Sequence, residues 1–121
     1  MNEDFVSFEL AKKLKEKGFP QYTEKSYFVG DHKKRMCSVG TFLHIHTQNT
    51  AHLIAAPTIS QVLKWLRNEH VFHVEILREK YKGWQYFIQL SDASYTGHGS
   101  KYDSYEAAAL AGIEYVLDIL I

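Results

Sequence analysis

Two closely spaced histidines are residues of a type that could bind a metal ion. His44 and His46 stand two apart in 41–46, a segment that resembles a short β-strand, so both rings would project from one face. His-x-His is a spacing used by metal ligands, and His52 or Asp31 could supply a further ligand. Zinc requires three or four ligands, and nothing in the sequence fixes their convergence. The alternative is a half-exposed strand that uses histidine as a polar aromatic.

Acid–base and thiol chemistry are weaker candidates. His73 and Glu75 share one face of a predicted strand, but no nucleophile or oxyanion site is placed beside them. Cys37 is the one cysteine, so it cannot form an internal disulfide or a cysteine-based zinc site. It follows a basic turn, yet no histidine is placed to act as its base. The sequence therefore favours a non-enzymatic protein and implies no cofactor.

Two basic clusters are candidates for contact with nucleic acid. The chain balances 14 Lys+Arg against 14 Asp+Glu, whereas phosphate binding normally uses a basic surplus. The bases concentrate early and the acids on the last helix, a division that could steer a partner or favour self-association. A simpler explanation for this distribution of charge is that both groups lie on helix faces exposed to solvent. The candidate contacts are Lys12 and Lys13 within 12–17, and Lys33, Lys34 and Arg35.

The glycine-rich segment before the last helix suggests another mode of nucleic-acid binding. A helix, antiparallel strands and a turn with Ser100 and Lys101 leading into a helix resemble the layout of a double-stranded-RNA-binding domain. That family places further lysines where this chain has Tyr102 and Tyr105. After Lys101 the chain has four acids and no lysine or arginine, so this face would repel a phosphate backbone. RNA binding of this kind is therefore disfavoured.

Aromatic residues are the better indication of function. They make up 14% of the chain, with 8 tyrosines, and many lie in the C-terminal half. Tyrosine and tryptophan are favoured at protein interfaces, where they bury a large area and keep a polar tip. Many must also complete a small core. We expect a surface for a protein partner or a homodimer on a predicted hairpin, with candidate residues His73, Leu77, Trp84, Tyr86 and Phe87.

Hydrophobic periodicity predicts three helices that position these residues. The first covers 5–17 and ends at Gly18, which can adopt the left-handed conformation of a helix cap, with Pro20 beyond it. The second opens at Pro57 and Thr58. The third starts at Asp103, which forms a capping box with Glu106, and runs to the last residue.

Alternating apolar residues predict the strands. Short strands are expected at 27–29 and 41–46, and a hairpin at 72–77 and 84–90 with a turn near 79–83. A further short strand at 94–96 is possible, and His98 is placed in a flexible loop. The prediction is an α+β fold: an antiparallel sheet of two hairpins, with or without a short extra strand, packed by three helices.

Length and composition bound the class of protein. The 121 residues are expected to form a single α+β domain over 1–121. A hydrophobic fraction of 45% makes intrinsic disorder improbable. The start is acidic, without a signal-peptide core, and no stretch approaches the roughly 20 apolar residues of a membrane span. The expectation is a soluble cytoplasmic domain that does not enter a membrane.

Three segments carry a resemblance that covers nearly the whole chain in order. They are residues 5–19, residues 56–67, and residues 102–107 together with 111–117. These segments resemble a family of small proteins from gut bacteria and their phages. The resemblance transfers no catalytic residue and no ligand. It implies only a context, that of a cytoplasmic accessory protein from a mobile element.

Overall fold

The chain divides into two compact units. The computed structural model describes residues 4–21, 23–28, 36–38, 53–81 and 83–121. Unit 1 is Met1–Thr58 and unit 2 is Ile59–Ile121. In the described residues each unit combines helical structure with an antiparallel three-stranded sheet, so the predicted α+β class is confirmed.

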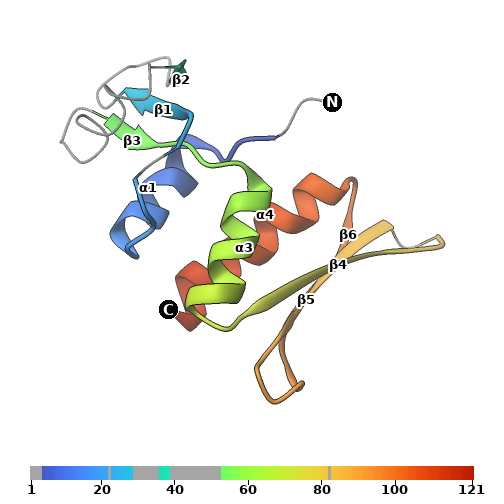
Figure 1. Cartoon of the computed structure of the whole chain (residues 1–121). Coiled ribbons are helices and arrows are strands. Elements are labelled where there is room, and N and C mark those ends of the chain that lie inside the picture. Colours follow the sequence, from blue (N-terminus) through green and yellow to red (C-terminus); the bar gives the residue numbers. More distant parts are fainter. Residues whose placement is uncertain (1–3, 22, 29–35, 39–52, 82) are drawn as a thin grey trace. The chain divides into compact units, whose positions relative to one another are not determined.

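The described residues of unit 1 form one helix and a small sheet (Figure 1). The helix α1 spans Phe8–Glu16, and the strands are β1 (Lys25–Phe28), β2 (Met36–Ser38) and β3 (Leu53–Ala55). The strand order is β2-β1-β3, with both pairs antiparallel. The predicted strand at 27–29 therefore exists, one or two residues earlier. The predicted strand at 41–46 lies outside the described residues.

Helix α1 shows how local sequence sets its own limits. Ser7 is extended, and its hydroxyl accepts a hydrogen bond from the Leu10 amide, so the helix begins after it and not at Phe5 as predicted. At the other end Gly18 takes a φ of 91°, and the Phe19 amide donates to the Leu14 carbonyl over 2.9 Å. This is the predicted glycine cap, in which a left-handed residue satisfies the last carbonyls.

Two buried polar side chains join the parts of unit 1. The Gln21 amide nitrogen donates to the Phe19 carbonyl, and its oxygen accepts from the Ala55 amide at 2.9 Å. The Tyr27 hydroxyl donates to the Val6 carbonyl. Burial, reinforced by the charge of Glu9, raises the pKa of Tyr27. Both side chains are therefore satisfied internally, as buried polar groups must be.

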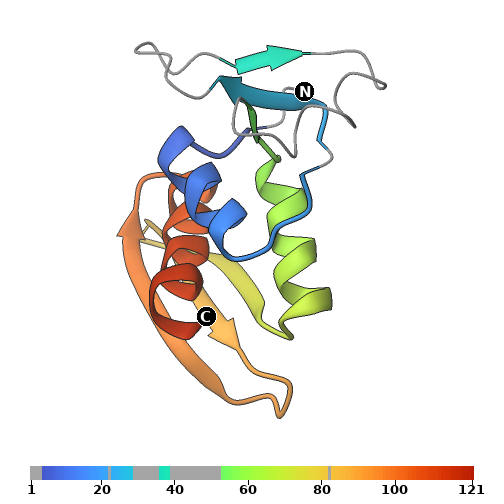
Figure 2. The ribbon, with the colours of Figure 1, turned by 90° about the vertical axis from the view of Figure 1, so that its left-hand side faces the viewer.

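Unit 2 has the element order helix, three strands, helix. Helix α3 spans Ile59–Glu69, and the strands are β4 (His73–Glu79), β5 (Gly83–Gln89) and β6 (Tyr95–Tyr102). Helix α4 covers Tyr105–Tyr115 and continues as the π-helical turn η1, Val116–Leu120. The sheet is antiparallel in the order β4-β5-β6. Both helices lie on the same side of it (Figure 2).

Strand β6 and the start of α4 correct the prediction. The expected short strand at 94–96 is the beginning of an eight-residue strand that includes Gly97–Lys101. His98 is therefore in a strand and not in a flexible loop. The helix cap is Ser104, whose hydroxyl accepts from the Ala107 amide, and not Asp103. Ser104 is still extended, as an N-cap residue usually is, and its side chain reaches the first turn of the helix.

The helix-facing side of this sheet requires glycine. A Cβ on Gly99 would stand 2.3 Å from the Tyr86 ring, and one on Gly97 would stand 2.8 Å from the Tyr115 ring. In α4, a Cβ on Gly112 would meet Val74 at 2.9 Å. Tyrosine rings thus occupy the space that side chains on β6 would need. These glycines allow close packing, which explains the Gly-x-Gly pattern without a bound phosphate.

No helix among the described residues is long and apolar enough to cross a bilayer.

The apolar core of unit 2 is contributed by both helices and the strands. Its buried residues include Ile59, Val62, Leu66, Val74, Ile88, Ile113, Val116 and Leu117.

Candidate functional site

The side of the β4-β5-β6 sheet that faces away from the helices, here called the outer face, carries the candidate site. Val74, Tyr86 and Ile88 are 8%, 6% and 0% exposed and belong to the helix-facing side. Since side chains alternate along a strand, Glu75 and Phe87 project from the other side. The register confirms the alignment, because Glu75 pairs with Phe87 on β5, and Phe87 pairs with residue 98 on β6.

A groove of about 600 Å³ runs across this outer face. Two large apolar side chains in it are substantially exposed, Leu77 at 46% and Tyr95 at 57%. All three strands of the sheet contribute to its lining. The lining residues are Glu75, Leu77, Phe87, Tyr95, Thr96, Gly97 and His98.

Three rings in the groove pack against one another. The Phe87 and His98 rings stack, with centroids 4.8 Å apart and planes 28° apart. Phe87 and Tyr95 meet edge to face at 5.9 Å. These are favourable arrangements for aromatic pairs. They give the centre of the outer face an apolar patch that is pre-organised and still open to solvent.

Glu75 is the one carboxylate among the lining residues. The Tyr95 hydroxyl donates to its Oε2 over 3.2 Å. This hydrogen bond, together with the negative charge of Glu75, raises the pKa of Tyr95. A carboxylate accepts about four hydrogen bonds, so Glu75 retains capacity for a ligand.

The β5–β6 connection places Tyr95 in the groove. Asp92 Oδ1 accepts from the Ser94 amide at 3.0 Å and from its hydroxyl at 2.6 Å. These hydrogen bonds lower the pKa of Asp92. Ala93 takes a φ of 70°, and the Leu90 amide donates to the Ser94 carbonyl at 2.7 Å, which closes the turn. Side-chain capture of the backbone is the usual role of aspartate in such turns.

Gln85 is an unusual feature beside the groove. It is only 4% exposed although alternation places it on the outer face. Its Oε1 lies 3.3 Å from His98 Nε2, while its own Nε2 is buried and has no hydrogen-bond partner among the described residues. A buried, unsatisfied donor of this kind is destabilising.

The predicted interface residues divide between the two faces. His73, Leu77 and Phe87 belong to the outer face. Tyr86 is buried against Gly112, and Trp84 meets the α4 residue Tyr105 edge to face at 5.8 Å. Trp84 and Tyr86 therefore complete the packing between sheet and helix.

Sequence reasoning omitted three groove residues from that surface: Glu75, Tyr95 and His98. Period-two alternation was sufficient to find Glu75, because it shares a face with Leu77. The other two required β6 to be recognised as a full strand. Its two glycines conceal that strand, since glycine is usually depleted in strands.

The remaining candidate residues lie largely outside the described residues. This holds for the metal candidates His44, His46 and His52, and for the basic residues Lys33, Lys34 and Arg35. Where the structure does describe the chain, no three histidine, cysteine or acidic residues are grouped as metal ligands. Lys12 is exposed on α1, with its Nζ 5.9 Å from the centroid of the Phe8 ring. Lys13, next to it, is half-buried.

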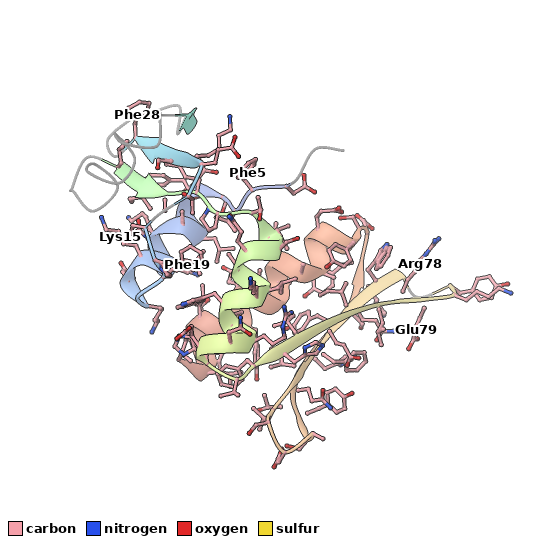
Figure 3. The ribbon with its side chains drawn as sticks, in the orientation of Figure 1. Phe5, Lys15, Phe19, Phe28, Arg78 and Glu79 are labelled. Carbon is pink, nitrogen blue, oxygen red and sulfur yellow. The ribbon has the colours of Figure 1, made fainter. Side chains whose placement is uncertain are left out.

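The tip of the β4–β5 hairpin is separate from the groove. Arg78 and Glu79 project from opposite sides of β4 (Figure 3). The Arg78 guanidinium lies 6.0 Å from the centroid of the Trp84 ring. Tyr81, beyond them, is 93% exposed with a φ of 72°. Glu79 does not line the groove, which makes it a natural comparison for Glu75.

The arrangement of the outer face suits binding. The groove on this face offers exposed rings, an apolar side chain and one carboxylate among its lining residues, groups that can form a contact surface. Comparisons with protein-family models, with curated proteins and with solved structures found no match.

Proposed function

We propose that this protein is a non-enzymatic binding module that contacts a protein partner through the outer face of the β4-β5-β6 sheet. The observation that carries the proposal is the groove, in which Leu77 and Tyr95 remain exposed beside Phe87. Binding sites are commonly concave and apolar, with a few polar groups that orient the ligand. The expected context is a cytoplasmic accessory protein.

A peptide segment is the partner that this surface favours over nucleic acid. No lysine or arginine is among the residues that line the groove, and Glu75 contributes a negative charge. A phosphate backbone would be repelled there. A protein segment can instead cover Leu77 and the exposed part of Tyr95, and so remove apolar area from water.

Selection of peptides from a random display library against the full chain tests the proposal. Peptides selected on the wild-type chain should lose at least tenfold in affinity for Leu77→Asp, because a charge then enters the apolar groove. Ile119→Asp is the matched control, since Ile119 is 65% exposed on η1. Its affinities should stay within twofold.

Equal losses in both variants, unchanged binding to Leu77→Asp, or failure to select any peptide would each contradict the proposal. Light scattering of the wild-type chain tests whether the partner is a second copy of the same chain, because it measures self-association. Self-association that Leu77→Asp abolishes would identify the outer face as a homodimer surface.

A further inference from the structure

We infer that the groove receives the cationic side chain of a lysine or arginine, arginine preferred, presented by the protein partner. This inference rests on the proposed function and specifies the chemistry of the partner. It follows from the position of Glu75 beside the rings of Phe87 and Tyr95.

The negative charge of the groove has no counterpart within the part of the chain that the structure describes. Glu75 accepts one hydrogen bond, from the Tyr95 hydroxyl, and no described lysine or arginine pairs with it. Covering this carboxylate with a purely apolar partner would desolvate a charge without compensation, which is unfavourable. A cationic side chain supplies the missing partner.

The rings supply a second attraction for a cation. The face of an aromatic ring is electron-rich and attracts ammonium and guanidinium groups within about 6 Å of its centroid. Tyr95 stands in the groove with more than half of its surface exposed, and its hydroxyl is tied to Glu75. The same residue therefore presents a ring and orients the carboxylate.

Arginine fits this arrangement better than lysine. Its planar guanidinium stacks on rings and donates two parallel hydrogen bonds to a carboxylate, whereas an ammonium acts as a point charge. Elsewhere in the same sheet a guanidinium already lies over an aromatic ring, with Arg78 Cζ 6.0 Å from the centroid of Trp84. A groove of about 600 Å³ also has room for the side chain and its flanking backbone.

The test uses pentapeptides Gly-Ala-X-Ala-Gly, acetylated and amidated, in which X is arginine, lysine or citrulline. Citrulline has nearly the shape of arginine without the charge. In NMR titrations of the isotope-labelled full chain, the arginine peptide should shift the amides of 75, 87 and 95–98. Its affinity should exceed that of the citrulline peptide at least fivefold, with lysine between them.

Paired variants assign the effect to one carboxylate. Glu75→Gln should abolish the preference for arginine over citrulline. Glu79→Gln removes the same charge from the same strand outside the groove, and should preserve the preference. The citrulline comparison in the wild-type chain needs no variant, so it decides the matter even if Glu75→Gln folds poorly.

Three results would overturn the inference: equal affinity for the arginine and citrulline peptides, an arginine preference that survives in Glu75→Gln, or a hexauridylate oligonucleotide that shifts the same amides. If library peptides bind the outer face without a basic residue, the inference fails while the proposed function stands. If they bind elsewhere, both fail.

Discussion

The two sides of the β4-β5-β6 sheet use aromatic residues in opposite ways. On the helix-facing side the Tyr86 ring leaves no room for a Cβ at Gly99 or Gly112. On the outer face the Phe87 ring packs with the Tyr95 and His98 rings, and Tyr95 is more than half exposed. An aromatic excess in a sequence therefore mixes residues that build the fold with residues that are available for binding.

Neighbouring residues on β5 give the largest expected contrast. Ile88 is fully buried, and we expect Ile88→Ala to lower the free energy of unfolding by about 3 kcal/mol, because it leaves a cavity. Phe87→Ala should cost about 1 kcal/mol, since this ring is only half-buried. Urea denaturation of both variants measures the difference. Equal losses would contradict the assignment of the two faces.

Adding one methyl group to the helix-facing side should have the next largest effect. Gly99→Ala places a Cβ against the buried Tyr86 ring, so we expect a loss of about 2 kcal/mol from overpacking. Ser100→Ala, an exposed position in the same strand, should stay within about 0.5 kcal/mol. In a Tyr86→Ala background the cost of Gly99→Ala should shrink, because the clashing ring is gone. A cost that stays the same would show that the ring is not the cause.

A smaller effect of opposite sign is expected at Gln85. Gln85→Met removes the buried amide nitrogen, which has no partner in the part of the chain that the structure describes, and also the contact with His98. Because an unsatisfied donor costs about as much as one hydrogen bond supplies, stability should be unchanged or rise by up to about 1 kcal/mol. Thermal unfolding of Gln85→Met and wild type measures this. A clear loss of stability would show that the amide is satisfied in solution.

The smallest change concerns the titration of Tyr95. Its pKa is raised by the hydrogen bond to Glu75 and by that charge, so Glu75→Gln should move the pKa down towards 10.0. The pair favours the protonated phenol, so its contribution to stability is complete below the unfolded pKa and is lost as the pH rises through the folded pKa. NMR titration of the ring measures it, with Glu79→Gln as control. If the pKa of Tyr95 is unchanged in Glu75→Gln, Tyr95 and Glu75 do not interact in solution.

Local patterns in the sequence predicted much of the fold. The glycine cap at Gly18 and the β4–β5 hairpin follow from residues close in sequence, and both are confirmed. The sequence predicts only the first residues of strand β6, because Gly97 and Gly99 weaken the strand pattern. Glycine is needed at these two positions because the Tyr86 and Tyr115 rings pack against them. These are tertiary contacts, which no local pattern in the sequence shows.

For the same reason the sequence brings together only some of the residues that line the proposed site. Alternation placed Leu77 and Phe87 together, but the groove also needs β6, which brings Tyr95 and His98 to them. The inclusion of Trp84 and Tyr86 followed from residue type alone. Type does not distinguish a packed ring from an exposed one, since that depends on the face from which it projects.

Mapping where a selected peptide binds tests the central claim most directly. The experiment is an amide NMR titration of the full chain with a library-selected peptide. If the peptide binds the outer face, we expect the largest shifts at Glu75, Leu77, Phe87 and 95–98. The amides of α1 and η1 should move little. Shifts concentrated on α1, on η1 or at the hairpin tip around Tyr81 would contradict it.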